Sequence, residues 1–484
     1  MPDGYVLEGD ATEPVSSVVD RESGLARQLS SRQLAMIAIG GAIGTGLFLG
    51  SSLAVRTAGP AVILSYAIGA IIALLLMGAL SEMAAAHPAA GSFGLYAEMY
   101  VSGWAGFVVR YTYWAVQCIA IGGEATAVAI YCQFWVPTAP PWIWIVGFSL
   151  GLVLVNAWSV GSFGEFEYWF STIKVAAIVA FIVLGTALIA GLGHTHIDPV
   201  TNLTAYDGFS PHGIAGMWMA MVFVIFSYIG TEVVAVTAGE AKDPRTAVPK
   251  AMRTMVGRLI VFYMGSIIVL VSVVPWNQIQ QGSDVKASPF VTVFKIIGIP
   301  AAAHIVNFVV LTAALSSMNC NLYLVTRMMF SLSRGGYAPA PFGKLTARGT
   351  PLNALLISAA GLFVATTVAF KYPNQAFVYL FGVSLFGGLF VWLMIFVTHL
   401  FFRRRYRPTD GQPLSVRMPG YPYTSILGVA AIAAILLTTW WVPNMSIALK
   451  AGLPWLGIIT AAYYLLLLTS KRKAKVRQGS GFRP

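Results

Sequence analysis

Long apolar runs recur along the whole chain and constrain its fold more than any other feature. We place twelve of them, at residues 34–55, 61–86, 104–135, 141–158, 169–191, 214–238, 254–275, 300–331, 352–370, 376–401, 424–442 and 453–470. A helix needs about 20 apolar residues to cross a bilayer. Strands of a membrane barrel would instead show an alternation with a period of two, which these runs lack. The sequence therefore predicts an all-α membrane protein with 12 transmembrane helices.

Composition supports the same fold class. Of the 484 residues, 57% are hydrophobic and only 10% are charged, whereas roughly a quarter are charged in a typical soluble domain. The net charge of +12 would suggest nucleic acid in a soluble protein. Here the basic residues gather in short loops between apolar runs, a pattern that orients membrane proteins. We therefore expect a lipid bilayer around the chain and no nucleic-acid partner.

The loop charges also predict the topology. If both ends of the chain are cytoplasmic, 24 Lys and Arg residues lie on the cytoplasmic side and five on the other. The positive-inside rule then favours a multi-pass protein of the plasma (inner) membrane with both termini in the cytoplasm. Residues 1–30 lack the apolar core of a signal peptide, so we expect a flexible cytoplasmic tail there. Residues 471–484 are expected to form a basic cytoplasmic tail.

The chain offers no signal for a metal or a cofactor. Its three cysteines, Cys118, Cys132 and Cys320, lie inside apolar runs and suggest neither a disulfide framework nor a zinc site. The phosphate-binding pattern G-x-x-x-x-G-K-[ST] does not occur. We therefore expect no ATP-driven transport by this chain, no metal and no cofactor.

A short string occurs in two of the runs. Ile43–Gly46 (IGTG) in the first run is followed 186 residues later by Ile229–Glu232 (IGTE) in the sixth. Because the offset covers five runs, an odd number, the two copies would cross the bilayer in opposite directions. Interrupted helices at corresponding positions of an inverted repeat are typical of secondary transporters that bind their substrate near the midplane. Close helix packing is the alternative for the glycines of the first run, since they include G-x-x-x-G spacings.

Interrupted helices would supply a particular chemistry. They leave amide and carbonyl groups that lipid cannot satisfy, so the interruption must line a cavity or bind something polar. The half-helix that begins near Gly46 would present N–H groups and a positive dipole end to a carboxylate, and Thr45 would add a hydroxyl. The ends of the preceding halves would present carbonyl oxygens to an ammonium group. An α-amino acid carries both groups.

Five strings together resemble a known superfamily. They lie at Ser31–Gly50, Ser81–Glu98, Phe163–Val175, Phe226–Pro244 and Leu315–Arg327. They resemble the amino acid, polyamine and organocation (APC) superfamily, and more narrowly its bacterial amino acid transporter branch. The resemblance implies a core of the LeuT type at 31–401, a 5+5 inverted repeat with broken helices 1 and 6. It also implies two additional spans within 402–470, and import of amino acids coupled to protons.

The resemblance further implies roles for individual positions. Thr45 and Gly46 would hold the substrate carboxylate. The carbonyls of Ala42, Phe226 and Ile229 would accept its ammonium group, and Phe226 would also be an aromatic gate. The other candidate substrate-binding residues are Ile43, Gly44, Gln117, Glu124, Ser227 and Gly230. The chain departs from the usual family pattern at 111–114 (YTYW), where the family often has Asn, so the substrate is left open.

Lys174 is the one basic residue that this topology leaves inside a run. Charges inside a membrane are costly and usually functional. The resemblance implies that its ammonium group occupies the place where sodium-driven relatives bind Na⁺, against carbonyls of the first interruption and the hydroxyl groups of Ser316 or Ser317. We expect these residues to couple transport to protons. A lysine that extends to the nearby interface is the alternative.

Acidic residues divide into two groups. Glu232 follows the second interruption, where it is expected to relay protons, with a purely structural helix cap as the alternative. Glu124 lies deep in the third run and resembles the glutamate of aromatic-amino-acid and γ-aminobutyrate carriers, with a structural partner as the alternative. We expect Glu82, Glu165 and Glu167 to anchor loops outside the site.

These observations predict a secondary active permease, with proton symport of L-amino acids by alternating access as the main hypothesis. An exchanger and a membrane sensor without major flux are the alternatives. A membrane enzyme is not favoured, because the runs contain no nucleophile–base pair or metal-ligand cluster. Neutral amino acids are the expected substrates, and Glu124 would instead favour a cationic side chain. The oligomeric state is left open.

Overall fold

The computed structural model describes residues 15–44, 46–192, 197–242, 244–279, 289–299, 301–371, 376–406, 414 and 416–479. Regular structure in these residues is helical, apart from one isolated bridge between Leu29 and Ala241. In the described residues, nine helices are long and apolar enough to cross a membrane. Two further apolar helices, at Leu352–Gly361 and Tyr423–Thr438, are shorter. The all-α membrane fold is confirmed in outline, while the path of twelve spans stays a prediction.

The helices follow one another along the chain in a simple order. The first part contains α1 (Val15–Asp20), α2 (Ser31–Ala42), the π-helical segment η1 (Gly46–Gly50), α3 (Ser51–Ala58), η2 (Gly59–Ala61), α4 (Val62–Ala86), α5 (Ser92–Tyr100), α6 (Gly103–Gln133), α7 (Pro141–Trp158), α8 (Val160–Ile189), α9 (Pro199–Thr204), α10 (Gly213–Tyr228), α11 (Val233–Val236) and η3 (Thr237–Glu240). The second part contains α12 (Pro244–Val273), η4 (Trp276–Gln278), α13 (Pro289–Ile296), α14 (Ala302–Arg334), η6 (Ala340–Gly343), α15 (Leu352–Lys371), α16 (Ala376–Arg405), α17 (Tyr423–Thr438) and α18 (Ile447–Gly479).

The helix α2 is interrupted at the first copy of the repeated string. It begins with a capping box, in which the Ser30 hydroxyl accepts the Gln33 amide and the Gln33 side chain accepts the Ser30 amide. It ends with Ile43 as its C-cap, and the chain resumes as η1 and then α3. The predicted interruption of the first run is therefore confirmed.

The second interruption lies at the corresponding place. Helix α10 ends with Ile229 as its C-cap, and α11 begins at Val233. Gly230 between them has a φ of +105°, a conformation that glycine adopts without steric cost. Both interrupted helices thus end at the isoleucine of the repeated string, 186 residues apart.

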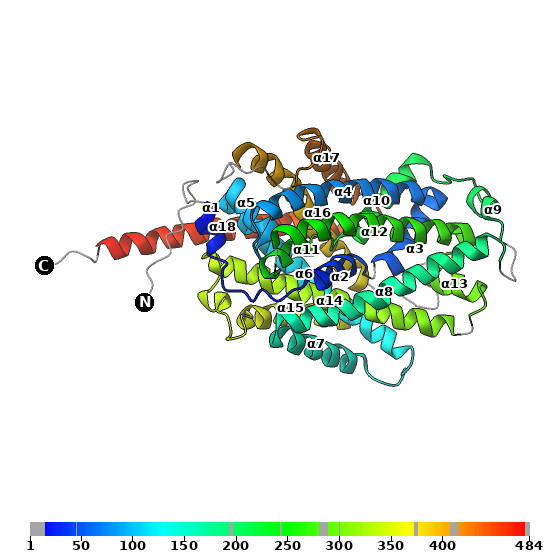
Figure 1. Cartoon of the computed structure of the whole chain (residues 1–484), viewed down its shortest axis with the longest axis horizontal. Helices are drawn as coiled ribbons and strands as arrows, with labels where there is room; N and C mark the ends of the chain where they lie inside the picture. The colour runs from blue at the N-terminus through cyan, green and yellow to red at the C-terminus, as the bar shows by residue number, and fades with distance from the viewer. Residues whose placement is uncertain are drawn as a thin grey trace.

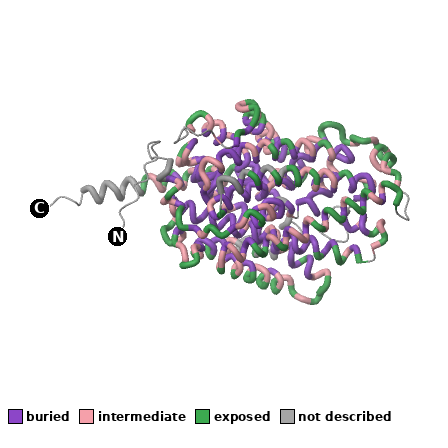
Figure 2. Tube along the Cα trace, in the orientation of Figure 1, coloured by how far each residue is buried: buried purple, intermediate pink, exposed green. Residues whose placement is uncertain are grey.

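Burial separates an inner group of helices from an outer one. Helix α14 packs against α6, α8 and α15, and α6 also packs against α16. The apolar windows of α14 and α16 are 83% buried, whereas those of α7 and the membrane-crossing part of α18 are 17% buried. Figure 2 shows buried residues concentrated inside the bundle and exposed ones at its periphery. The exposed side of α7 carries large apolar side chains such as Leu154 and Trp158, as a lipid-facing helix would.

Helices near the two ends of the chain lie at one end of the bundle. Figure 1 shows α1, α5 and the last turns of α18 together at the left, with α9 and α13 at the right. This arrangement agrees with termini on one side of the membrane. That this side is the cytoplasm stays a prediction from the loop charges.

A charged cluster ties the segment before α2 to this end of the bundle. Arg21 donates to Glu98 of α5 at 2.8 Å, and the fully buried Arg110 of α6 donates to the second Glu98 oxygen. The Glu22 carboxylate accepts the Gly91 amide at 2.6 Å. We call these five residues and Ser331, which donates to Glu22, the N-terminal cluster.

The two carboxyl groups of the N-terminal cluster are shifted in opposite directions. Burial raises the pKa of Glu22 above its usual value of 4.5, against the opposing effects of Ser331, Arg110 and Gly91. Burial acts the same way on Glu98, but the charges of Arg110 and Arg21 outweigh it and hold that pKa below its usual value. Two carboxyl groups in one cluster therefore favour opposite protonation states.

Candidate functional site

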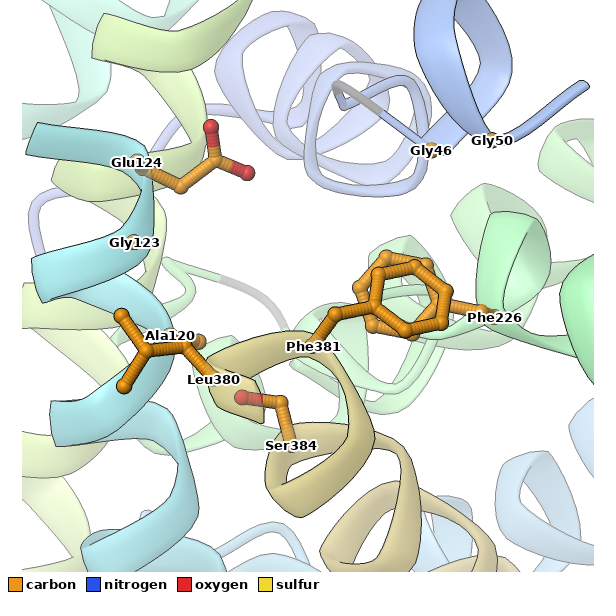
Figure 3. A pocket seen from close by; sticks show the side chains of 9 residues that line it. All are labelled: Gly46, Gly50, Ala120, Gly123, Glu124, Phe226, Leu380, Phe381 and Ser384. Atoms are coloured by element: carbon orange, nitrogen blue, oxygen red, sulfur yellow. The ribbon is translucent and has the colours of Figure 1, made fainter. Parts of the chain in front are cut away.

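A cavity of about 40 Å³ lies beside the first interruption, between η1, α6, α10 and α16. One water needs about 10–15 Å³ by the same measure, so the cavity has room for a small group. The lining residues are Gly46, Gly50, Ala120, Gly123, Glu124, Phe226, Leu380, Phe381 and Ser384 (Figure 3). Three of the residues predicted for the substrate site, Gly46, Glu124 and Phe226, are thus brought together.

One wall of the cavity is aromatic and the opposite side carries an acid. The Phe226 and Phe381 rings have their centroids 4.0 Å apart. Figure 3 shows the Glu124 carboxylate pointing into the cavity, toward the side where Gly46 and Gly50 lie. Sequence reasoning missed Phe381 and Ser384, because no short motif marks the face of α16 that meets α6 and α10.

Gly46 is held close to the neighbouring helix α10. A Cβ atom at Gly46 would lie 3.2 Å from the Ser227 Cα and 3.3 Å from the Phe226 ring. The Ser227 hydroxyl donates to the Gly46 carbonyl at 3.2 Å. Only glycine allows this approach without a shift of the backbone or the ring. The close helix packing that was the alternative explanation for the glycines is therefore present at Gly46. The same residue also lines the cavity.

Lys174 of α8 lies against the first interruption. Its ammonium group donates to the Ile43 carbonyl at 2.8 Å, to the Gly40 carbonyl and to the Ser316 hydroxyl at 2.8 Å. The side chain is fully buried, so the alternative of a lysine that extends to the interface is wrong. The predicted contacts with broken-helix carbonyls and with Ser316 are present. The role of Lys174 in coupling stays a prediction.

Ser317 lies elsewhere. The Ser317 hydroxyl lies near Gly44, 3.6 Å from the place where a Cβ atom would be. The Lys174 ammonium group donates its hydrogen bond to the Ser316 hydroxyl instead. The Ile43 carbonyl is engaged by Lys174 rather than left open for a substrate.

Glu232 caps the second interruption. Its Oε2 accepts the Gly230 amide at 3.0 Å and the Trp392 indole N–H at 3.3 Å, and its Oε1 accepts the Tyr113 hydroxyl at 3.0 Å. The carboxylate is fully buried. The capping geometry is present, while the proton relay stays a prediction. Tyr113 and Trp392 were not predicted as partners, although Tyr113 belongs to the string that departs from the family pattern.

Several other predicted binding residues are engaged within the protein. The Phe226 carbonyl accepts the Ile229 amide at 3.2 Å. The Ser227 carbonyl accepts the Tyr263 hydroxyl at 2.6 Å. The side chain of Ile229 packs toward Gly388, where an added Cβ would lie 2.4 Å from it.

The last three predicted residues are placed as follows. Gln117 is buried beside Tyr113 and is not among the residues that line the cavity. Ala42 is the last residue of α2, and its side chain lies outside the described part of the structure. Thr45 lies outside the described residues altogether.

The expectation that Glu167 anchors a loop is wrong. Glu167 is fully buried inside α8, where its Oε1 accepts the hydroxyls of Ser171 at 3.1 Å and of Ser316, and its Oε2 accepts the Asn319 amide at 3.3 Å. The expected span began at 169, but α8 begins at Val160. A spacing of four and three residues places Glu167, Ser171 and Lys174 on one helix face, a signal that could have identified the cluster.

Glu165 and Glu82 agree better with the expectation. Glu165 is exposed, 3.6 Å from Arg32, and accepts the Trp169 indole N–H at 3.1 Å. Glu82 is buried in α4 but accepts the Met418 amide at 3.0 Å. Glu82 therefore anchors the segment between α16 and α17.

In the described residues, no three His, Cys, Asp or Glu side chains are grouped so that they could hold a metal ion. The three cysteines are unpaired and buried. The site is thus formed by backbone groups, two aromatic rings and a few buried ionisable side chains.

Comparison with known proteins agrees with this geometry. Residues 33–476 match the family described as amino acid permease. The γ-aminobutyric acid permease of Bacillus subtilis (strain 168) is 39% identical over 465 residues, which cover 96% of this chain and 97% of the relative. The amino-acid permease RocC of the same organism is 40% identical, covering 92% and 96%. The aromatic amino acid transport protein AroP of Salmonella typhimurium (strain SL1344) is 37% identical, covering 92% and 97%.

These relatives are named as permeases or transport proteins and not as enzymes. They match nearly the full length of the chain, and the resemblance found in its short strings is confirmed. The chain therefore belongs to the amino acid permease family.

Proposed function

We propose that this permease imports L-amino acids by proton symport with alternating access, as a multi-pass protein of the plasma membrane with cytoplasmic termini. The observation that carries the proposal is the buried Lys174 ammonium group on the carbonyls of Gly40 and Ile43, at the same interruption that contributes Gly46 to the cavity wall. A LeuT-type 5+5 repeat is the architecture we propose for it, supported by two interruptions that end at matching isoleucines.

The coupling proposal follows from electrostatics. Carbonyl oxygens freed by an interrupted helix attract a cation, and half-helix C-terminal ends often hold Na⁺ or H⁺ in transporters. In this protein a side-chain cation already occupies the carbonyls of Gly40 and Ile43. A transporter of this kind needs no sodium ion there, and a proton gained and lost by Lys174 is the natural coupling ion.

The substrate proposal follows from the cavity. We propose that the substrate carboxylate lies at the start of η1, near Gly46, and that Phe226 and Phe381 cover the bound solute. Glu124 would face the amino group or a cationic side chain. Relatives named for γ-aminobutyric acid and for aromatic amino acids support a substrate that combines a carboxylate with an amine. Neutral amino acids are our first expectation, and the acid at Glu124 favours cationic ones as the second candidate.

The test is uptake of radiolabelled amino acids into proteoliposomes without sodium. We expect accumulation when the lumen is more alkaline than the medium, and loss of accumulation when a protonophore collapses the gradient. Liposomes without protein are the blank, and a sodium gradient without a pH gradient is the control for the coupling ion. Accumulation that depends on sodium and ignores the pH gradient would overturn proton coupling.

A second pair of measurements separates net uptake from exchange. Vesicles that start empty are compared with vesicles preloaded with the same amino acid. Symport predicts uptake in both, whereas an obligate exchanger takes up label only when preloaded. Binding without uptake in either would favour the sensor. A thermal-shift series over the twenty amino acids and γ-aminobutyrate identifies the substrate class, and the best stabilisation by lysine, arginine or histidine would favour the cationic candidate.

A further inference from the structure

The buried carboxylate of Glu167 has no part in the substrate site described above. It lies on the same face of α8 as Lys174, two helical turns away, and both side chains are fully buried. A buried carboxylate is costly unless it is well paired. Because Glu167 lies beside the proposed coupling lysine, we looked for a functional role of this carboxylate.

One hydroxyl joins the two side chains. Lys174 donates an N–H to the Ser316 oxygen at 2.8 Å, and Ser316 in turn donates its O–H to Glu167 Oε1. The three groups thus form a continuous chain of hydrogen bonds from a donor cation to an acceptor anion. Every hydrogen bond in this chain points from Lys174 toward Glu167.

We propose that Glu167 is the proton acceptor for Lys174, reached through the Ser316 hydroxyl; this inference rests on the proton symport proposed above. In the step, an N–H bond of the Lys174 ammonium breaks and its proton bonds to the Ser316 oxygen. The original Ser316 proton bonds to Glu167 Oε1. The products are a neutral amine, an intact hydroxyl and a carboxylic acid, so protons and charge balance without another reactant.

The direction of the transfer fits the predicted topology. Glu167 lies seven residues nearer the start of α8 than Lys174, which is about 10 Å along a helix axis. The loop charges place the start of α8 on the cytoplasmic side. The backbone of the acceptor therefore lies nearer the cytoplasm than that of Lys174, although both side chains reach the same Ser316 hydroxyl and the transfer itself covers only this short distance.

Neutralising Lys174 would also loosen the first interruption. The ammonium group has three N–H donors, which serve the two carbonyls and Ser316. The neutral amine keeps two N–H donors, which can still serve the two carbonyls, and its lone pair faces the Ser316 hydroxyl, but without the positive charge these hydrogen bonds are weaker. Proton transfer to Glu167 would thus weaken the contact between α8 and the end of α2, a change suited to alternating access.

The surroundings contain few competing ionisable groups. The other titratable groups that interact electrostatically with this pair are the Cys320 thiol of α14 and the Glu124 carboxyl group of α6. Helices α2 and α7 contribute the Gly40 carbonyl and the Asn156 amide, which bonds Asn319 at 2.9 Å. No hydrogen bond or ion pair between α12 and either charged group is found in the described part of the chain. Cys320 is therefore the one group that needs its own control.

The experiment compares variants in sodium-free proteoliposomes, with both pH-driven uptake and exchange measured. Glu167→Gln keeps the size of the side chain and one acceptor oxygen, which can still receive Ser316 and Ser171, but it cannot accept a proton and its amide N–H₂ loses the bond from Asn319. We expect pH-driven accumulation to fall by about tenfold or more, a flattened pH profile, and exchange within about twofold of wild type. A purely structural role would lower driven uptake and exchange together.

Matched variants isolate the hydrogen-bond chain. Ser316→Ala removes the bridging hydroxyl and should reproduce the loss, whereas Ser316→Thr retains a hydroxyl and should recover most of the driven uptake. Glu165→Gln, an exposed carboxylate two residues away, and Cys320→Ser should behave as wild type. The serine pair keeps the test decisive if Glu167→Gln does not fold.

An infrared measurement gives a readout apart from transport. A pH step on purified wild-type protein should change the absorption of protonated carboxylic acids, and the part of this change that comes from Glu167 should be missing in Glu167→Gln. Driven uptake in Glu167→Gln with the wild-type pH profile would overturn the inference alone. A wild type that ignores the pH gradient would overturn the inference together with proton symport.

Discussion

The two interrupted helices satisfy their freed backbone groups with opposite charges. At the end of α2, the carbonyls of Gly40 and Ile43 receive the ammonium group of Lys174. At the end of α10, the amide of Gly230 donates to the carboxylate of Glu232. Matching sequence strings thus end in complementary electrostatic environments, a cation beside the carbonyls and an anion beside an amide.

The origin of each charge differs as well. Glu232 lies two residues from Gly230, whose amide donates to it. The carboxylate and the amide therefore belong to the same segment, and they move together. Lys174 comes from a different helix, 131 residues along the chain from Ile43. A contact between two helices can break when they move apart, whereas the bond from the Gly230 amide to Glu232 lies within one segment and does not depend on the additional bonds from Tyr113 and Trp392. We therefore assign the change of state to the first interruption and the preservation of shape to the second, and the predictions below test this division.

The largest effect is expected from Gly46→Val. Because a Cβ here already approaches Ser227 and the Phe226 ring to 3.2 and 3.3 Å, the added methyl groups would displace the wall of the cavity. We expect substrate affinity to fall by about a hundredfold, corresponding to about 3 kcal/mol, while the protein still inserts in the membrane. Binding is measured by thermal shift or by scintillation proximity with purified protein.

Gly50→Ala is the matched control. Gly50 lines the same cavity, but a Cβ there has no atom within 4 Å. We expect its affinity to stay within about threefold of wild type. Normal affinity in Gly46→Val would remove the first interruption from the substrate site.

Lys174→Ala is expected to separate transport from binding. The substitution removes the donor to two buried carbonyls, at a cost of about 1–3 kcal/mol each when no water replaces it. Accumulation driven by a pH gradient should fall by about a hundredfold, while equilibrium binding changes by about tenfold or less. Both are measured on one reconstituted preparation. Equal losses in binding and driven uptake would contradict a coupling role.

Glu232→Gln is expected to act on stability instead. The carboxylate accepts hydrogen bonds from Gly230, Tyr113 and Trp392, and hydrogen bonds to a charged group contribute about 1.5–3 kcal/mol. We expect a lower free energy of unfolding, seen as a drop in Tm, with the pH profile of driven uptake unchanged. Tyr113→Phe removes one of the three donors and should give a smaller drop. A flattened pH profile in Glu232→Gln would favour the proton relay instead.

The sequence predicted the two interruptions because they depend on a short repeated string, whereas the environment of Lys174 was implied by the family resemblance. The glycines at the interruptions are visible without knowledge of helix packing, whereas the contact of Lys174 in the fifth run with carbonyls of the first is not. Phe381 and Trp392 could not be predicted, since their roles depend on how α16 rotates against α6 and α10. Glu167 was misplaced for a different reason. Hydropathy detects the apolar part of a span, whereas α8 extends nine residues further toward the polar end.

The smallest expected effect is a change of Tm with pH in the N-terminal cluster. Its carboxyl groups Glu22 and Glu98 lie outside the membrane-spanning helices. The pKa of Glu22 is raised by burial, so its contribution to stability is present below the usual value of 4.5 and is lost as pH rises through the raised pKa. Glu22→Gln imitates the protonated form at every pH. We expect its Tm to match wild type below the usual pKa value of 4.5 and to exceed it by about 2 °C once the pH is above the raised pKa.

Glu98→Gln should show the opposite dependence. Arg110 and Arg21 hold the pKa of Glu98 below its usual value, so its contribution is present above that value and is lost as pH falls through the lowered pKa. The variant should therefore be less stable than wild type at neutral pH, and the deficit should shrink only in acid. Thermal unfolding followed by tryptophan fluorescence across the pH range measures both variants. Parallel curves for wild type and the two variants would show that neither carboxyl group changes its protonation on folding. Opposite trends would show that folding raises the pKa of Glu22 and lowers that of Glu98.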